Sequence, residues 1–391
     1  MGKIMYMNKE FQGRIPRVEI NGLTPTDDYS TSETFTGLTW IDGKPIYKQT
    51  LYYETAAAGN SLNHKFYIKD IDTLIKRESR CNIQGQPFQR MNDSWTELWF
   101  GGCHSDHLHT KESFWQAGLY YTYNDYQITF WYTKTTDQPI TPDLNKPNYS
   151  LTEQFTGLTW VDGRKIYQKT IHLEDILADS YELYSTGLTG VGTVIDREYI
   201  ADRGQNGIVI NDEWIPQSNW AGFCACTYFV QDNGTLKVQI QNNTYAIDDL
   251  YLTIRYTKSA ESPITPPTDK INYSMTEQNT GLKWIDGKDI YQKTVYWATV
   301  PRLAGGNYKN VLFTGTTTLD KAISYEMVST RGDDGGYYAR DGKSYTGSPN
   351  LGIYQIMHLD GDTCVEIDTN TTDGVKDVYF TLRYTKQTGG E

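Results

Sequence analysis

Apolar and polar side chains alternate in three similar stretches of the chain. In the first stretch, Ile128, Phe130 and Tyr132 alternate with a threonine and a tryptophan. The equivalent apolar residues of the other two stretches are Leu252, Ile254, Tyr256, Phe380, Leu382 and Tyr384. A period of two is typical of a β-strand with one buried face. We therefore expect three strands whose apolar side chains point into a core.

A second pattern, with the frame Gly-Leu-x-Trp-x-Asp-Gly-x-x-Ile-Tyr, also occurs three times. Its copies span residues 37–47, 157–167 and 281–291. Asp-Gly between two β-prone runs predicts a β-hairpin with a two-residue type I′ turn, because aspartate tolerates a positive φ and glycine adopts it freely. In the first copy this turn would pair Ile41 with Lys44, and Trp40 with Pro45.

The tryptophan of this hairpin has a structural and a functional interpretation. Leu38 and Trp40 point to the same face, because side chains alternate along a strand. Together with their counterparts they form a set that we expect in the core: Leu38, Trp40, Leu158, Trp160, Leu282 and Trp284. The alternative is a sugar site in which the indole ring stacks on the ligand. Three identical sites would be unusual in modules that otherwise diverge, so the structural interpretation is favoured.

The repeats divide the chain into three units. The hairpins lie about 120 residues apart, which is the size of a domain rather than of a solenoid repeat. The constant ends and variable middle of each unit predict an all-β chain of three tandem β-sandwich modules, jelly-roll-like, behind a short N-terminal arm. The boundaries are residues 1–28 for the arm and residues 29–134, 149–258 and 273–386 for modules 1, 2 and 3.

Proline-rich segments join the modules. Residues 135–147 and 259–269 both contain the sequence Pro-Ile-Thr-Pro. Proline stiffens a linker and holds it extended. We therefore expect an elongated molecule.

The composition agrees with this fold and limits the partners. The chain has 31 tyrosines, 10 tryptophans and 34 glycines, which suit strands and turns. A net charge of −12 argues against a surface for nucleic acid. The N-terminus lacks the apolar region of a signal peptide, and no apolar run approaches the thickness of a bilayer. We therefore expect no nucleic acid as a partner and no insertion into a membrane.

The cysteines do not mark a repeated disulfide. They lie at positions that differ between the modules: Cys81, Cys103, Cys224, Cys226 and Cys364. A disulfide that belonged to the repeated scaffold would recur at one module position. We therefore expect free thiols, with Cys224 and Cys226 packed on the same face of a strand.

One cluster of histidines is a candidate metal site. His104, His107 and His109 offer three imidazoles, which suit zinc or another divalent ion. The spacing matches no strong motif, and the other two modules lack the cluster. A polar loop or an exposed strand face is the alternative.

A loop of module 3, residues 329–347, is a candidate ligand site. It contains Arg331-Gly-Asp, a tripeptide that carries little information alone, and the aromatic residues Tyr337, Tyr338 and Tyr345. Tyrosines among Asp and Gly suit contact with a glycan or a protein. A plain exposed loop is the alternative. No nucleophile-elbow, zincin or phosphate-loop motif occurs in the chain, so we expect neither an enzyme nor a cofactor.

The N-terminal arm is too short to fold alone. Its apolar residues Ile4, Met5, Tyr6, Phe11 and Ile15 are spread along a polar strip. A terminal segment of this kind is either a disordered tail or becomes ordered by docking. The apolar residues favour docking.

The repeated frame resembles modules of bacteriophage virion proteins. It begins with Tyr-Ser-x-x-Glu, continues with Thr-Gly-Leu-x-Trp-x-Asp-Gly-Lys-x-Ile-Tyr and ends with Tyr-Thr-Lys; the second copy has arginine for that first lysine. The resemblance covers residues 29–386, and it is greatest to head fibre proteins of crAss-like phages. It implies a non-enzymatic, trimeric fibre that is fixed to the capsid or another virion protein through residues such as Ile4 to Ile15. It also implies adhesion to host-surface or mucosal glycans. Trp131, on the polar face of its strand, is a candidate for the trimer contact.

Other functions remain open on the sequence. A tail fibre or receptor-binding protein shares the same setting. A secreted carbohydrate-binding protein is an alternative of another class, although the missing signal peptide and odd cysteine count argue against it. A glycosidase is a more distant alternative.

Overall fold

The computed structural model describes the chain from residue 26 to residue 387 with gaps. The described ranges are 26–56, 59–83, 88–91, 96–99, 112–119, 123–142, 146–178, 180–202, 208–210, 224–242, 246–267, 271–300, 309–315, 318–331, 337–339, 351–359, 362–369 and 375–387. The elements of this part are strands in antiparallel sheets, so the all-β prediction is confirmed. A search of these residues finds no helix of the length and hydrophobicity needed to span a membrane.

Each module contributes eight of the described strands. Module 1 has β1 (Thr34–Thr39), β2 (Pro45–Ala56), β3 (Gly59–Lys69), β4 (Ile71–Ile83), β5 (Phe88–Met91), β6 (Thr96–Trp99), β7 (Glu112–Leu119) and β8 (Tyr123–Lys134). Module 2 has β9 (Gln154–Thr159), β10 (Lys165–Ile176), β11 (Ser180–Thr189), β12 (Val191–Asp202), β13 (Ile208–Ile210), β14 (Cys224–Asp232), β15 (Thr235–Asn242) and β16 (Ile247–Lys258). Module 3 has β17 (Gln278–Lys283), β18 (Asp289–Val300), β19 (Lys309–Phe313), β20 (Leu319–Arg331), β21 (Tyr337–Ala339), β22 (Leu351–Leu359), β23 (Asp362–Thr369) and β24 (Val375–Lys386).

Module 2 is a β-sandwich with jelly-roll-like wrapping. Its inner sheet has the order β13-β12-β16-β10-β9, and its outer strands pair as β11-β15-β14. The pairing of β10 with β16 encloses the pairing of β11 with β15, which is how a jelly roll wraps. The core between the two layers includes Phe229, Val238, Leu252, Ile254 and Tyr256, all fully buried. Modules 1 and 3 repeat the four-stranded arrangement of the inner sheet, as β1-β2-β8-β4 and β17-β18-β24-β20.

The sheets continue from one module into the next. The short strand β5 of module 1 pairs with β22 of module 3, and β21 of module 3 pairs with β14 of module 2. Two eight-stranded sheets result, and each contains strands of two modules. The modules therefore share backbone hydrogen bonds as well as side-chain contacts.

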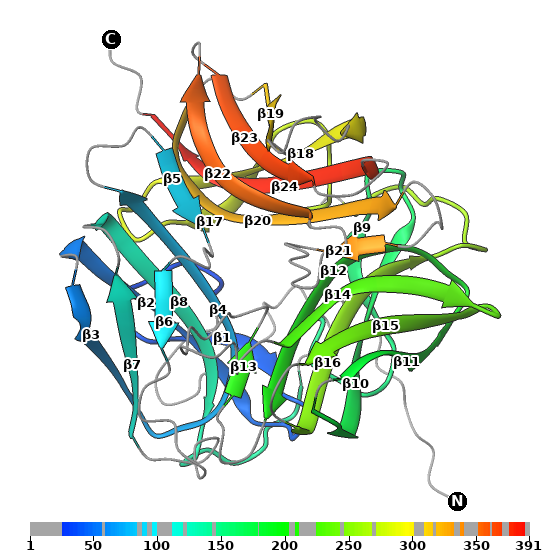
Figure 1. Cartoon of the computed structure of the whole chain (residues 1–391), viewed down its shortest axis with the longest axis horizontal. Coiled ribbons are helices and arrows are strands. Elements are labelled where there is room, and N and C mark those ends of the chain that lie inside the picture. Colours follow the sequence, from blue (N-terminus) through cyan, green and yellow to red (C-terminus); the bar gives the residue numbers. More distant parts are fainter. Residues whose placement is uncertain are drawn as a thin grey trace, which may run out of the picture.

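The three modules surround a common centre, with module 1 in blue, module 2 in green and module 3 in yellow to red (Figure 1). The elongated shape expected from the linkers is therefore wrong. Each linker folds back over the hairpin of the module before it. Ile140 N donates to Gly43 O at 2.9 Å, and Ile264 N donates to Gly163 O at 2.9 Å. The prolines stiffen a bound segment here rather than a free spacer.

The repeated frame closes each module on itself. In module 1, Glu33 accepts hydrogen bonds from Tyr132 Oη at 2.6 Å and from Lys134 Nζ at 2.5 Å. The corresponding acceptors are Glu153 for Tyr256 and Lys258, and Glu277 for Tyr384 and Lys386. These hydrogen bonds join the opening glutamate of each module to the tyrosine and lysine of its closing strand. This contact explains why both ends of the frame are constant.

Both faces of the closing strands are covered. Ile128, Phe130 and Tyr132 are fully buried, as are their counterparts in modules 2 and 3, so the predicted core face is confirmed. The threonines on the opposite face, Thr129, Thr253 and Thr381, are buried as well. That face was expected to be polar and solvated. It is covered because it looks towards the centre of the ring.

The hairpin turn differs from the predicted type I′ turn. Gly43 has a φ of 85°, but Asp42 keeps a negative φ and accepts a hydrogen bond from Lys44 N at 2.9 Å. Trp40 N donates to Lys44 O at 2.9 Å, so Trp40 is opposite Lys44 and not Pro45. The loop therefore has one residue more than predicted. A single glycine suffices for a three-residue hairpin, and the aspartate caps the turn instead of adopting positive φ.

The core predictions hold for the tryptophans and in part for the leucines. Trp40, Trp160 and Trp284 are buried. Their leucine neighbours are only partly buried, although they pack against the same clusters. Cys226 and Cys364 are buried and belong to no disulfide, as expected.

Candidate functional site

The hairpin tryptophan of each module packs against the tyrosine that opens the next module. The pairs are Trp40 with Tyr149 (ring centroids 4.9 Å apart), Trp160 with Tyr273 (4.9 Å) and Trp284 with Tyr29 (4.7 Å). The third pair joins the last module to the first, so the ring closes within one chain. We call these contacts the first, second and third joints.

Backbone hydrogen bonds repeat at the three joints. At the first joint, Tyr149 N donates to Thr39 O at 3.1 Å, and Asn148 Oδ1 accepts from Thr39 N at 2.8 Å. Asn272 and Thr159 make the same contacts at the second joint. At the third joint the acceptor is a carboxylate: Asp28 Oδ1 accepts from Lys283 N at 2.7 Å, and Tyr29 N donates to Lys283 O at 3.0 Å. The joints are thus three versions of one docking contact.

The joint tyrosines also reach inwards to three glutamates. Tyr29 Oη donates to Glu78 at 2.9 Å and Tyr149 Oη donates to Glu198 at 2.7 Å, while Tyr273 Oη donates to Glu326. All three tyrosines are buried. Burial, together with the adjacent carboxylate, raises the pKa of each tyrosine well above its usual value, so the hydroxyl keeps its proton and remains the donor.

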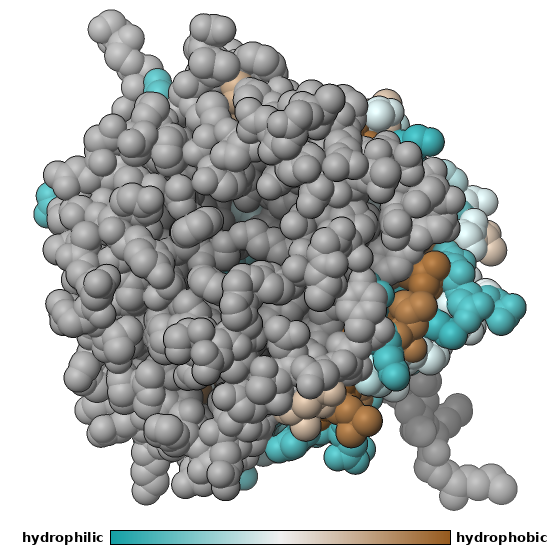
Figure 2. Space-filling view, viewed as in Figure 1, coloured by the Kyte–Doolittle hydropathy of each residue, from teal (hydrophilic) through white to brown (hydrophobic). Residues whose placement is uncertain are grey.

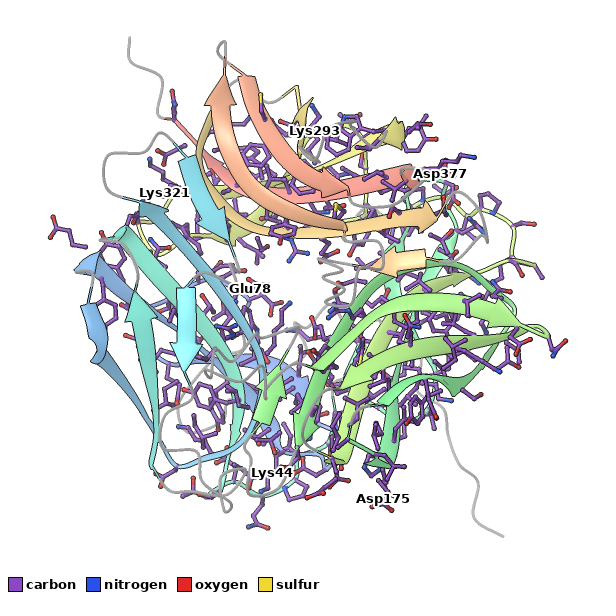
Figure 3. The ribbon with its side chains drawn as sticks, viewed as in Figure 1. Lys44, Glu78, Asp175, Lys293, Lys321 and Asp377 are labelled. Atoms are coloured by element: carbon purple, nitrogen blue, oxygen red, sulfur yellow. The ribbon has the colours of Figure 1, made fainter. Side chains whose placement is uncertain are left out.

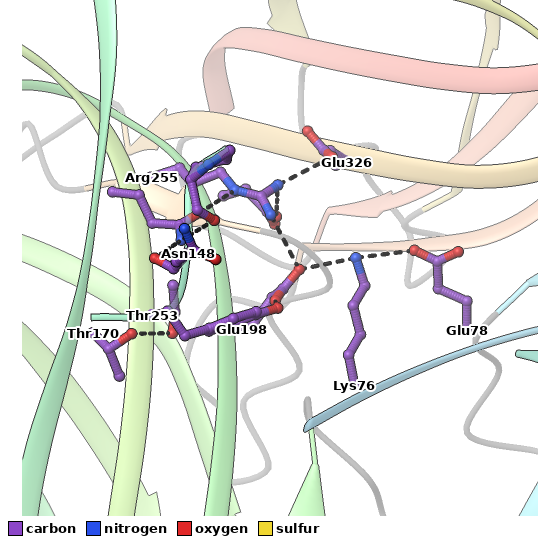
Figure 4. Close-up of polar contacts among 12 residues, drawn as sticks. Lys76, Glu78, Asn148, Thr170, Glu198, Thr253, Arg255 and Glu326 are labelled. Carbon is purple, nitrogen blue, oxygen red and sulfur yellow. Dashed lines mark hydrogen bonds and ion pairs between the residues drawn. The ribbon is translucent and has the colours of Figure 1, made fainter. Parts of the chain in front are cut away.

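Cations connect these glutamates across module boundaries (Figure 4). Lys76 Nζ of module 1 lies 2.8 Å from Glu198 of module 2 and 3.1 Å from Glu78 of its own module. Arg255 of module 2 lies 3.5 Å from Glu198 and 3.7 Å from Glu326 of module 3. We call this group, with the residues that flank it on the same strands, the central network. Glu78 lies near the middle of the molecule in Figure 3.

The network keeps Glu326 ionised despite its burial. Burial alone would raise the pKa of this carboxyl. The guanidinium groups of Arg383 and Arg255 outweigh that effect, and the pKa of Glu326 is lowered below its usual value. Its lone pairs are engaged by the Tyr273 hydroxyl and these cations. The arrangement is therefore suited to cohesion between modules.

Module 1 fills one network position differently from the other modules. Trp131 stands opposite Lys48, where Arg255 stands opposite Gln168 and Arg383 stands opposite Gln292. Lys48 Nζ lies 4.4 Å from the centre of the Tyr29 ring, and the Trp131 and Tyr29 rings meet edge to face at 6.3 Å. Burial lowers the pKa of Lys48 to about 8. Trp131 is therefore part of the third joint, inside the chain.

A pocket opens beside the first joint. It has a volume of about 550 Å³ and is lined by Trp40 and Tyr149, by Leu151 and Phe155, and by polar groups that include Lys146. Leu151 is 51% exposed and Phe155 is 43% exposed, so both present apolar surface to solvent beside the pocket. Apolar and aromatic walls with a few polar groups are typical of a small-ligand site.

Large apolar side chains are also exposed elsewhere on module 2. Besides Leu151 and Phe155, these are Leu177 at 74% and Leu183 at 45%. Figure 2 shows hydrophobic surface on the side of the molecule where module 2 lies. Exposed apolar surface of this kind suits contact with a partner.

The predicted site residues fall mostly outside the described residues. This applies to His104, His107 and His109, to the arm residues Ile4, Met5, Tyr6, Phe11 and Ile15, and to Tyr345. Tyr337 and Tyr338 lie in β21 and pair with Thr330 and Ser329 on one side and with Phe229 and Tyr228 on the other. They are part of a strand that joins two modules, not of the loop that was expected.

A second titratable cluster was missed by the sequence analysis. His172 Nε2 lies 2.6 Å from Asp249, and His172 Nδ1 lies 3.8 Å from Glu174. The three residues could supply ligand atoms within 4.8 Å of one another on the surface of module 2. The imidazole also stacks on Tyr251 at 4.4 Å. The hydrogen bond between His172 and Asp249 and the stacked tyrosine ring account for this arrangement without a metal ion.

The sequence held one signal for the central network. A glutamate follows the opening tyrosine at nearly the same distance in each module, 49, 49 and 53 residues later. Buried glutamates at matched positions suggest a shared polar contact.

No model of a known protein family matches the chain, and a comparison with curated proteins finds none that is similar.

Proposed function

We propose that this chain is a non-enzymatic structural component of a bacteriophage virion, a head fibre. The N-terminal arm anchors it to the capsid or another virion protein, and the three modules form a projecting head. The resemblance of the repeated frame to phage fibre modules supports the setting. The observation that carries the structural role is the closure of three modules into one ring through the same joint.

The polar chemistry at the centre of the ring supports cohesion as its task. The carboxylates of the central network accept from tyrosine hydroxyls or pair with cations, and two of these cations come from a neighbouring module. Truncating one partner of such a buried pair is costly, so the network resists separation of the modules. A rigid head of this kind suits a particle that must survive outside the cell.

The homotrimer stays a prediction, but Trp131 no longer supplies the contact between its copies. Trp131, the residue expected to make the trimer contact, packs against Tyr29 of the same chain. Copies of the chain would therefore have to meet through other surfaces. The exposed apolar side chains of module 2, such as Leu177 and Leu183, are the surface we propose for contact with a second copy.

Adhesion to glycans is the second part of the proposal. The pocket beside the first joint combines the rings of Phe155 and Tyr149 with the polar groups of Lys146 and Asn148. Sugar rings present an apolar face and several hydroxyls, which match walls of this kind. Phe155→Ala should weaken binding of mucosal glycans about tenfold on a glycan array, a loss typical of a removed aromatic contact. Met275 of module 3 is 51% exposed and belongs to neither the pocket nor the proposed contact between copies, so Met275→Ala is the control and should leave binding unchanged.

Immunogold electron microscopy of purified particles tests the virion assignment. Antibody raised against the folded chain should label the capsid. Label at the tail tip would favour the alternative of a receptor-binding tail protein. Absence of label from every particle would contradict the virion proposal, and glycan binding without label would favour a carbohydrate-binding protein.

A further inference from the structure

Two of the three hairpin turns are covered by the linker that follows the module. At the first turn, Pro139 lies so close that a Cβ placed on Gly43 would be 3.0 Å from the proline Cβ. At the second turn, Pro263 lies at the same 3.0 Å from such a Cβ on Gly163. The next residue of each linker donates its N–H to the turn glycine, from Ile140 or Ile264, at 2.9 Å. Each linker thus supplies one proline contact and one backbone hydrogen bond.

The third turn has no such cover among the described residues. A Cβ placed on Gly287 would meet no atom of the described residues within 4 Å, although the turn has the same shape, with a φ of 84°. The hydrogen bond from Gly287 N to Trp284 O, at 2.9 Å, matches the bonds at the other two turns. We call the surface of each turn that faces a linker its seat. Among the described residues, the seats at Gly43 and Gly163 are covered and the seat at Gly287 is open.

The N-terminal segment is in register to fill this seat. Ile140 lies nine residues before Tyr149, and Ile264 lies nine residues before Tyr273. Ile20 lies nine residues before Tyr29. In each case the tyrosine is the residue that packs on the tryptophan of the covered hairpin. The distance along the chain from joint to seat is thus the same for the N-terminal segment as for the two linkers.

The described chain before Tyr29 already follows the path of the linkers. Asp28 Oδ1 accepts from Lys283 N, as Asn148 and Asn272 accept at their joints. Lys48 Nζ donates to Asp27 O, while Gln168 at the equivalent strand position donates to the carbonyls of the first linker. The chain therefore reaches the third joint from the direction in which both linkers reach theirs.

We propose that residues 19–24 of the same chain occupy the open seat on the module 3 hairpin, with Ile20 N donating to the Gly287 carbonyl. The segment then covers the hairpin turn at the third joint, as the linkers cover the turns at the first two joints. It completes the ring without a covalent connection. Residues 1–18 are left to reach a partner. This inference does not depend on the proposed virion location.

Hydrogen–deuterium exchange of the full chain tests the proposal. In the native protein, a peptide covering residues 282–292 should exchange as slowly as one covering residues 38–48. Ile20→Asp should speed exchange of the third hairpin about tenfold. The variant removes the contacts between the segment and the hairpin, so the hairpin opens without having to break them. Ile20→Asp should leave the first hairpin unchanged. Ile15→Asp is the matched control and should change neither hairpin.

Two further measurements complete the test. A chain lacking residues 1–24 should exchange rapidly at the third hairpin, and added peptide of residues 15–25 should slow it again. Fast exchange of that hairpin in the unmodified chain, or no response to Ile20→Asp and to the deletion, would overturn the proposal. Protection that rises with protein concentration, together with a dimer in light scattering, would instead place the segment of a second copy in the seat and would also overturn it.

Discussion

Two neighbouring rows of side chains run across the inner sheets, and they differ in how far the modules agree. The first row is the same in each module: two threonines and a glutamate, as in Thr170, Thr253 and Glu198. The second row lies two residues along the same strands and changes from module to module. It reads Lys48, Trp131 and Lys76 in module 1, Gln168, Arg255 and Asp196 in module 2, and Gln292, Arg383 and Ser324 in module 3.

The comparison shows that charge balance, rather than residue identity, links the two rows. The constant row carries one carboxylate in each module, Glu78, Glu198 and Glu326. The changing row carries two cations in module 1, a cation and an anion in module 2, and one cation in module 3. Three net negative charges thus face three net positive charges. A buried network tolerates redistribution of its cations as long as each carboxylate keeps a partner.

Removing a carboxylate of the constant row should have the largest effect. Glu198→Gln leaves Lys76 and Arg255 without a shared anion, because Glu198 lies 2.8 Å and 3.5 Å from them. The expected loss is about 3–5 kcal/mol in the free energy of unfolding, as for other broken buried pairs. Urea denaturation followed by tryptophan fluorescence measures it. Glu78→Gln is the matched variant in module 1 and should cost less, and equal losses would contradict the bridging role of Glu198.

Placing arginine in the changing row of module 1 should come next. Trp131→Arg adds a cation beside Lys48 and Lys76, and we expect a loss of about 2–4 kcal/mol. The double variant with Lys48→Gln moves the charge to the strand where modules 2 and 3 carry it. There the arginine Nε donates to the glutamine, at 3.1 Å for Arg255 and 2.9 Å for Arg383. The double variant should recover about half of the stability lost by Trp131→Arg. If the losses of the two single variants simply add, Lys48→Gln does not compensate for the added arginine.

Lys48 should make stability depend on alkaline pH. Its folded pKa of about 8 is lower than the usual 10.5, so the unfolded chain binds more protons between these values. Stability of the native protein should therefore rise with pH across this window. The Lys48→Gln variant lacks this dependence. The difference in the free energy of unfolding between the native protein and the variant should therefore change by on the order of 2 kcal/mol from pH 7 to pH 10. If the free energy of unfolding of the native protein and of Lys48→Gln changed with pH in parallel, Lys48 would not be buried as a cation.

Substitution of the constant threonines should give the smallest and most uniform effect. Thr50 and Thr129, Thr170 and Thr253, and Thr294 and Thr381 all lie 2.9 Å apart through their hydroxyl oxygens. Thr50→Val, Thr170→Val and Thr294→Val should each cost about 1 kcal/mol, the usual value of a buried hydrogen bond. Calorimetric melting of the three variants compares them. Unequal losses would mean that the modules differ in more than the changing row.

The sequence predicted the parts of the molecule that local chemistry decides. Asp42-Gly43 placed a hairpin correctly, although glycine alone took the positive φ and the loop gained a residue. The alternation around Phe130 gave the core face of the closing strand. Both signals act within a few residues, where backbone sterics and strand periodicity leave few alternatives.

The tertiary structure alone decided the ring and its centre. Contacts such as Trp284 with Tyr29, or Lys76 with Glu198, join residues far apart in the chain, and no local pattern specifies which surfaces meet. By alternation Thr129 therefore looked solvent-exposed. It is buried, on the sheet face that also carries Glu78 and the contact of Lys76 with module 2. The sequence by itself determined the all-β class and the repeated hairpin and closing strand. Their closure was decided by the free energy of burying tryptophan, tyrosine and paired charges between them, which only the assembled chain expresses.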